Sequence, residues 1–239
     1  MNRTSGKHGQ GIHKPNPSVS KSKRARRFPN RFSGFDRTLA QRGQASTSIT
    51  STGSQTYTVP AGVDSLTITM YGGGGGGGLA KAGRGGTTKG GGGGGGARLV
   101  ITLDEVTPGE TLTFNVGVGG AKSTSNNAVS TAGGDTTFSY GGKDYVAGGG
   151  ENNRSGGLAM GGGSPPDGSG GAGDCDGGST CTATAGNDGT AYNTGDSTTP
   201  GGNSLETSDS SGAGAGGTGS NNTGVQNAAD GQNGKVVIS

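Results

Sequence analysis

Two segments of the sequence, SLTITMYGGGGGGG at residues 65–78 and GGGGGGGARLVITL at residues 90–103, each join a strand-like stretch to a run of seven glycines. The strand-like stretch precedes the first run and follows the second. Apolar and polar residues alternate beside each glycine run, which is typical of a half-buried antiparallel strand. Segments without Cβ atoms can approach one another closely and form hydrogen bonds through their backbones. We therefore predict a close-packed array of left-handed extended helices of the polyproline II kind, built on a β-sandwich.

Further strand signals surround these two segments. The residues near Tyr57 and the final VVIS at 236–239 are typical of strands, and TPGE at 107–110 is a turn signal. DTTFSYGGKDYVAGG predicts a hairpin over Gly141 and Gly142. Alternation in TLTFNVGVG places four apolar side chains on one face: Leu112, Phe114, Val116 and Val118. Together these signals predict roughly seven short strands.

The predicted fold class is mainly β: a small antiparallel β-sandwich that carries a bundle of polyglycine II helices, with an extended basic N-terminal arm. We divide the chain into three parts. Residues 1–45 form the arm, residues 46–147 with 235–239 form the sandwich and the two glycine runs, and residues 148–234 form a glycine-rich region of helices and loops.

The composition lies far outside that of ordinary globular domains, with 59 glycines among 239 residues, 25% hydrophobic residues and no Trp. Burial of so few side chains cannot offset the entropy lost on ordering this backbone. Backbone hydrogen bonds, close contacts or partner chains must supply the difference, or residues 150–234 are disordered like a flexible linker. The strand signal GKVVIS at 234–239 favours an ordered segment that returns to the sheet.

Charge is divided sharply along the chain. Residues 1–42 contain eleven of the 19 basic residues and one of the 16 acidic residues, so this part carries +10 and the remainder −7. Three of the five phenylalanines lie in the same part, within RRFPNRFSGFDR. We expect an anchoring arm with these candidate residues: Lys21, Lys23, Arg24, Arg26, Arg27, Phe28, Arg31, Phe32 and Phe35.

The arm is open to more than one interpretation. Its phenylalanines indicate a peptide that docks aromatic rings into pockets of another protein and becomes ordered on binding, and the alternative is that the rings pack on the β-domain. The basic run KSKRARR at 21–27 fits the phosphates of nucleic acid and fits an acidic protein surface equally well.

Cys175 and Cys181 are the two cysteines of the chain, separated by DGGST. A loop this short and rich in glycine can close into a disulfide, and free thiols are the alternative. Two cysteines without a nearby histidine make a poor zinc pattern. A disulfide would indicate a location outside the reducing cytosol.

Enzymatic chemistry is not expected. His8 and His13 are the two histidines, both in the arm, so the β-region cannot assemble a Ser-His-Asp or Cys-His site. Neither glycine run continues into the Lys-Ser/Thr of a phosphate-binding loop. We predict no catalytic residue, no metal and no cofactor. No apolar stretch is long enough to cross a membrane, and we expect no membrane insertion and no classical secretion signal.

Polar loops of the glycine-rich region are candidates for receptor contact. Asn, Ser, Thr, Gly and Tyr supply the adaptable polar chemistry that recognition loops use, and loops that serve only solubility are the alternative. The candidate residues are Asn152, Asn153, Arg154, Pro165, Pro166, Asp167, Asn187, Asp188, Tyr192 and Asn193.

The chain resembles a known family over residues 55–239. YTVPAGVDSLTITMYGGGGGGG, then GGGGGGGARLVITLDEVTPGETLTFNVGVGG, GGDTTF and a closing GKVVIS are similar to the glycine-rich domain of bacteriophage tail-fibre adhesins and other virion proteins. The resemblance implies a β-sheet scaffold with packed polyglycine helices and variable tip loops that contact host receptors. The basic arm departs from tail-fibre adhesins and is more typical of virion proteins that face the capsid interior.

We accordingly expect a virion structural protein, a spike or adhesin, that attaches to the host surface. The alternative is a capsid decoration or minor capsid protein whose arm binds shell subunits or genome. The expected partners are other virion proteins through the arm, viral nucleic acid, a host cell-surface receptor and further copies of the chain in a homo-oligomer. An ice-binding protein would share the glycine helices but leave the arm unexplained.

Overall fold

The computed structural model describes residues 46–79, 81–83, 86–88, 90–125, 128–152, 168–175, 180–189, 198–199, 201–206, 212–220 and 228–239. The chain separates into two units, Met1–Thr38 and Leu39–Ser239, and every described residue belongs to the second. The candidate residues of the arm therefore lie outside the described residues. The described part contains strands and no helix, so the prediction of a mainly β fold is confirmed.

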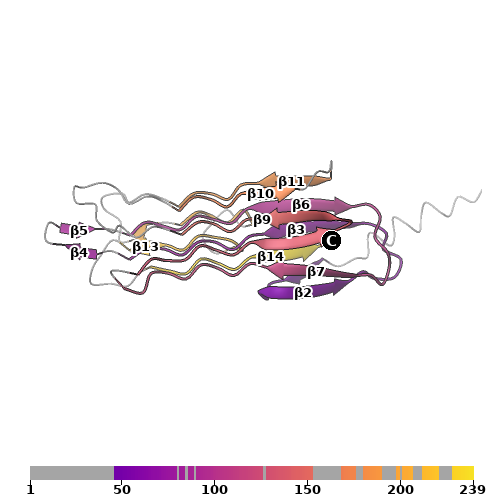
Figure 1. The fold of residues 1–239 in the computed structure, drawn as a ribbon, viewed down its shortest axis with the longest axis horizontal. Coiled ribbons are helices and arrows are strands. Elements are labelled where there is room, and N and C mark those ends of the chain that lie inside the picture. Colours follow the sequence, from indigo (N-terminus) through magenta and orange to yellow (C-terminus); the bar gives the residue numbers. More distant parts are fainter. Residues whose placement is uncertain are drawn as a thin grey trace, which may run out of the picture. The chain divides into compact units, whose positions relative to one another are not determined.

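Two five-stranded antiparallel sheets form the sandwich (Figure 1). The first sheet has the strand order β1-β14-β3-β6-β11, with β1 Thr47–Ile49, β14 Lys235–Ile238, β3 Leu66–Tyr71, β6 Arg98–Leu103 and β11 Cys181–Thr184. The second has the order β10-β9-β8-β7-β2, with β10 Gly173–Cys175, β9 Lys143–Ala147, β8 Thr136–Tyr140, β7 Thr111–Val116 and β2 Gly53–Thr58. Two small ladders pair β4 Lys81–Gly83 with β5 Gly86–Thr88, and β12 Thr198–Thr199 with β13 Gly219–Ser220.

The core lies between the two five-stranded sheets and follows the predicted alternation. In β3 the side chains of Leu66, Ile68 and Met70 are buried, and in β6 those of Leu99 and Ile101 are buried. The second sheet contributes a stacked pair, Phe114 and Phe138, with ring centroids 4.7 Å apart. The remaining core members are Val59, Leu103, Val106, Leu112, Val116, Tyr145, Ala147, Val236 and Ile238.

Both predicted turns are confirmed. β8 and β9 form a hairpin in which Gly141 and Gly142 have φ values of 59° and 75°, as a two-residue turn with left-handed central residues requires. At 107–110 the N–H of Glu110 donates to the carbonyl of Thr107 at 3.0 Å, and Gly109 has φ 85°. Glycine relieves the strain of that positive φ.

One predicted side-chain position is wrong. Val118 does not share the buried face of Leu112, Phe114 and Val116, because β7 ends at Val116 and Val118 is 57% exposed. The physical reason is the change of backbone at Gly117. From that residue on, the chain leaves the strand, and the two-residue alternation no longer applies.

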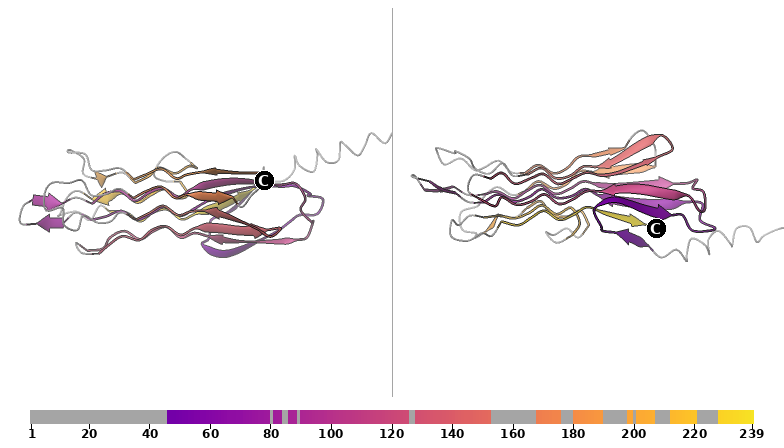
Figure 2. Two further views of the ribbon diagram at one scale, coloured as in Figure 1. Left: turned by 45° about the horizontal axis from the view of Figure 1, so that its top comes forward. Right: turned by 60° about the horizontal axis from the view of Figure 1, so that its bottom comes forward.

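Glycine-rich segments leave the strands on one side of the sandwich and return to it (Figures 1 and 2). Outgoing segments follow β3, β7, β9 and β11, at residues 72–78, 117–123, 148–152 and 185–189. Incoming segments precede β6, β8, β10 and β14, at residues 90–97, 128–135, 168–172 and 228–234. Residues 201–204 and 214–218 form a further incoming and outgoing pair. We call these segments together the glycine array.

Backbone hydrogen bonds in the array repeat every three residues. The N–H groups of residues 72–78 point in turn to three incoming segments, and no bond is made within the run. The bonds, with N···O distances, are Gly72, Gly75 and Gly78 to Ala97, Gly94 and Gly91 (3.0, 2.8 and 3.0 Å); Gly73 and Gly76 to Gly134 and Thr131 (2.9 and 2.9 Å); and Gly74 and Gly77 to Gln232 and Ala229 (2.8 and 3.1 Å).

Candidate functional site

The described part of the second unit has two distinct ends. The turns at 60–65, 104–110 and 141–142 lie at the end of the sandwich away from the array, and we call this end the base. β4, β5 and β13 lie at the opposite end of the array, which we call the tip (Figure 1). The pairing of Thr47 with Ile238 places the start of β1 at the base. The first described strand of the chain therefore begins at the end opposite the tip.

The first glycine run lies at the centre of the array. Besides the three incoming segments to which residues 72–78 donate, three outgoing segments donate to the run. The donors are Gly120 and Ser123 to the carbonyls of Gly74 and Gly77 (2.7 and 3.0 Å), Gly150 to Gly73 (2.8 Å), and Gly217 to Gly75 (2.7 Å). Neighbouring backbones thus surround this run on every side.

The second run, residues 90–96, is surrounded in the same way. Its N–H groups point in turn to three outgoing segments: Gly93 and Gly96 to Gly217 and Gly214 (2.9 and 2.7 Å), Gly94 and Ala97 to Glu151 and Gly148 (2.9 and 2.9 Å), and Gly95 to Asn187 (2.7 Å). Its carbonyls accept from residues 75, 78, 168, 171 and 202. All residues of both runs are buried.

This environment explains why the two runs contain no other residue type. A Cβ atom at Gly74, Gly75 or Gly77 would lie 1.9–2.0 Å from a neighbouring carbonyl oxygen. Segments at the margin of the array have a free side and carry larger residues there, such as the exposed Val118. A long uninterrupted glycine run therefore indicates a segment that has other backbone segments on all of its sides.

Side chains complete the hydrogen bonding at the margin of the array, where the next backbone is missing. Four backbone N–H groups donate to carboxylate or amide oxygens at 2.7–2.8 Å: Gly119 to Asn233, Lys122 to Asp230, Gly149 to Asp135, and Gly170 to Asp188. This role of the side chains was not predicted from the sequence. The sequence feature that could have predicted it is a short polar residue next to a glycine, but we interpreted such residues as loop residues.

Three of the predicted receptor-contact residues are described, and each contacts the array. The Asn152 side chain donates to the carbonyl of Ser130 at 2.7 Å, and that of Asn187 donates to the carbonyl of Asn203 at 3.0 Å. Asp188 accepts from Gly170, as above. The other seven lie outside the described residues: Asn153, Arg154, Pro165, Pro166, Asp167, Tyr192 and Asn193.

A disulfide joins Cys175 at the end of β10 to Cys181 at the start of β11. β10 is the edge of one sheet and β11 is the edge of the other, so the bond ties the two sheets together along one side of the sandwich. Both cysteines also pack against the core.

The base carries an acidic face formed by two connections. Asp64 lies in the β2–β3 connection, and Asp104, Glu105 and Glu110 lie in the β6–β7 connection. Backbone hydrogen bonds join the connections, from Val106 to Asp64 at 3.0 Å and from Val59 to Glu110 at 2.8 Å. Residues 59–65 and 104–110, both fully described, contain no Lys or Arg. We call the four carboxylates the acidic base.

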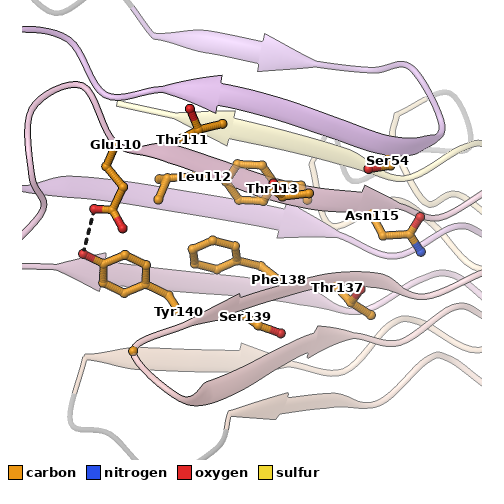
Figure 3. A pocket seen from close by; sticks show the side chains of 12 residues that line it. Ser54, Glu110, Thr111, Leu112, Thr113, Asn115, Thr137, Phe138, Ser139 and Tyr140 are labelled. Atoms are coloured by element: carbon orange, nitrogen blue, oxygen red, sulfur yellow. Dashed lines mark hydrogen bonds between the residues drawn. The ribbon is translucent and has the colours of Figure 1, made fainter.

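A cleft of about 680 Å³ opens between β7 and β8 beside the acidic base (Figure 3). β7 pairs with β2 along its whole length, but its pairing with β8 is limited to Phe114↔Phe138 and Asn115↔Thr137, so β7 and β8 separate towards the base. The lining is polar at the rim, with Thr113 and Ser139, and aromatic where Phe138 lies.

Glu110 and Tyr140 face each other across the base end of this cleft (Figure 3). The Tyr140 hydroxyl donates to the Glu110 carboxylate at 3.3 Å and to the carbonyl of Glu105 at 3.0 Å. Burial raises the pKa of Tyr140, and the nearby negative charge of Glu110, the hydrogen bond to it and the charge of Glu105 raise this pKa further. The hydroxyl therefore stays protonated and donates over the physiological range of pH.

A second ionised contact lies where the array meets the sandwich. Lys235, at the start of β14, forms a salt bridge with Glu206, which follows the array segment 201–204 in sequence. Glu206 also accepts from the N–H of Ala213 at 3.0 Å. Burial of Glu206 acts to raise its pKa, but these hydrogen bonds and the charge of Lys235 outweigh burial and lower the pKa below its usual value.

Metal-binding clusters and membrane-spanning helices are both absent from the residues that the structure describes. Within this part of the chain no group of three or more His, Cys, Asp or Glu side chains could hold a metal ion. The same part has no helix of the length and apolarity that a membrane crossing requires.

The glycine-rich domain family matches residues 49–238, and the chain belongs to this family. The matched range contains both five-stranded sheets apart from the first residues of β1, and all segments of the array. A comparison with curated proteins finds no match.

Proposed function

We propose that the segments of the array are left-handed polyglycine II helices. The support is the three-residue repeat of the hydrogen bonds, because a helix of this kind has three residues per turn and no bonds within itself. None of glycines 72–77 or 93–96 has a φ between +20° and +160°, which accords with the left-handed form. An array held by backbone bonds in several directions makes a rigid support without a large side-chain core.

We propose that this support displays recognition loops on a virion and that the protein is a spike or adhesin for host attachment. The observation that carries the proposal is that the base and the tip lie at opposite ends of the described part of the second unit. The first described strand begins at the base, whereas the ladders β4–β5 and β12–β13 lie on the tip side of the array. Connections 153–167 and 190–197 are attached to the array at the same side, through Asn152 and Gly189. The virion location rests on the resemblance to glycine-rich domains of phage adhesins.

Capsid decoration is the second candidate, and the charge of +10 on residues 1–42 favours it. An arm of this charge suits phosphate neutralisation or an acidic shell protein. In that case the array would stabilise the particle and the tip loops would have no ligand.

Competition for host cells separates the two candidates. The purified full chain is added to cells before the virus that carries it, and adsorption is counted. Attachment predicts that the full chain blocks adsorption, and that a variant with residues 154–166 and 190–197 replaced by Gly-Ser sequence does not. Thermal unfolding of both proteins is the folding control. If neither protein affects adsorption and particles without the chain infect normally but break open on heating, decoration is correct.

A further inference from the structure

The acidic base and the cleft beside it form one surface with two kinds of chemistry. Asp104 and Glu105 are exposed and Glu110 is half-buried, so the β6–β7 connection presents three carboxylates and contains no Lys or Arg. The cleft is about 680 Å³ in volume and Phe138 is among the residues that line it; the ring of Phe138 stacks with those of Phe114 and Tyr140, at centroid distances of 4.7 and 6.0 Å. Such a surface fits a peptide that carries both guanidinium and aromatic groups.

The chain contains a segment of that chemistry. Residues 24–35, RARRFPNRFSGF, alternate Arg and Phe without an acidic residue. Proline at position 29 favours an extended backbone, which is the form a peptide takes when its alternate side chains enter a cleft. Nucleic acid fits the acidic base poorly, because its phosphates would be repelled by the four carboxylates.

We propose that the acidic base is a docking site for residues 24–35 of a second copy of this chain. Phenylalanine side chains enter the cleft between β7 and β8, and arginine side chains pair with the carboxylates of the β6–β7 connection. A contact from the arm of one copy to the base of the next is heterologous, so copies related by a closing rotation form a ring. Such a contact between copies goes beyond display by a single chain and does not depend on what the tips bind.

A charge-swap experiment with the full chain tests the proposal. The base variant carries Asp104→Lys and Glu105→Lys, two exposed residues, and keeps the Glu110–Tyr140 contact. The arm variant carries Arg27→Glu and Arg31→Glu. Sedimentation velocity on nucleic-acid-free protein measures association at low salt, and a circular-dichroism melt of each variant verifies the fold. Glu151→Lys is the matched control, because Glu151 is an exposed carboxylate in the array, away from the base.

We expect the wild-type chain and the Glu151→Lys control to associate at low salt and to dissociate as salt is raised. Each charge variant alone should associate at least tenfold more weakly. An equimolar mixture of the two variants should recover a complex, because the basic arm of one meets the unchanged base of the other. A wild-type chain that stays monomeric at low salt, an unchanged affinity in the base variant, or a mixture that does not associate would each overturn the proposal. Docking of the arm within its own chain gives the first of these results.

Discussion

The amide nitrogen of Gly75 lies 2.8 Å from the carbonyl oxygen of Gly94, and this bond joins the middle parts of the two seven-glycine runs. On another side of Gly75 a Cβ atom would lie 2.0 Å from the carbonyl oxygen of Glu151. Backbone thus contacts backbone on several sides of one residue. The array is stabilised by these contacts in the way that an ordinary domain is stabilised by side-chain packing.

Gly75→Ala should therefore destabilise the chain strongly. The added methyl group meets a backbone oxygen that its neighbours hold in place, and we expect a loss of at least about 3 kcal/mol, the upper part of the range for overpacked cores. Urea unfolding followed by circular dichroism measures the loss. Gly134→Ala is the control, because a Cβ there would lie 3.1 Å from its nearest neighbour, the nitrogen of Val118. We expect the control to stay within about 1 kcal/mol of wild type, and equal losses in both variants would contradict close packing around Gly75.

Much of the sandwich could be predicted from sequence because its strands obey a local rule. Alternation in SLTITMY and ARLVITL identifies both the strands and their buried side chains, and the Gly141–Gly142 pair identifies the hairpin. The strands that were missed, β1, β10 and β11, are short and polar and lie at or beside sheet edges. β10 and β11 lie between glycine segments in sequence, and their pairing depends on partners far away in the chain.

The arrangement of the array could not be predicted in the same way. A glycine run shows that backbone must come close, but it carries no side chain that could specify which segment lies beside it. The neighbours of residues 72–78 come from sequence positions between 91 and 232. The marginal contacts of Asp230 and Asn233 are equally long-range, at separations of 108 and 114 residues. In the sequence, each of these two is a polar residue beside a glycine, and surface loops contain the same pattern.

Asp230→Ala should weaken the margin of the array. The Asp230 carboxylate accepts the N–H of Lys122 at 2.7 Å, and its removal leaves that donor to solvent. Since the bond is exposed, we expect a loss of roughly 1 kcal/mol in urea unfolding. Asp230→Asn keeps an acceptor oxygen at the same position and should recover most of the loss. Equal losses in the two variants would show that charge, and not the hydrogen bond, is what matters at this position.

Stability should decrease at acid pH through Glu206. The pKa of Glu206 is lower in the folded chain than in the unfolded chain, so its contribution is present above the unfolded pKa, near 4.5, and is lost as pH falls through the lower, folded value. Thermal melts from neutral pH to below the folded pKa of Glu206 measure the change. Glu206→Gln should have a melting temperature that depends less on pH in this window and is lower at neutral pH. An acid dependence identical to that of wild type would assign the effect to other carboxylates.

Removal of the disulfide should loosen one side of the sandwich. Cys175 and Cys181 are six residues apart and join the edge strands of the two sheets. Loop closure over so short a span predicts a loss of about 2 kcal/mol in a Cys175→Ala, Cys181→Ala variant. Reducing agent should lower the stability of wild type by a similar amount and leave the variant unchanged. A wild type insensitive to complete reduction would mean that packing of β10 and β11 alone holds this side together.

Hydrogen exchange tests the array directly. Residues 72–78 and 93–97 donate N–H bonds of 2.7–3.1 Å to neighbouring backbones and are buried, although they belong to no strand. If those bonds open only with the whole domain, their amides should exchange at least roughly a thousandfold more slowly than in a free peptide, as slowly as the amides of β3 and β6. Mass spectrometry on peptides from these segments provides the measurement.

The exposed amides of Ala61 and Gly62 in the β2–β3 connection supply an internal reference, because they lie outside the array and should exchange quickly. Gly75→Ala gives the decisive comparison. Because the first run contacts segments on every side, loss of packing at Gly75 should speed exchange in the second run as well as in the first. Fast exchange confined to residues 72–78 would mean that the segments are stabilised independently, each by the strand to which it is attached. Faster exchange in both runs of the Gly75→Ala variant would mean that the array opens as one cooperative unit.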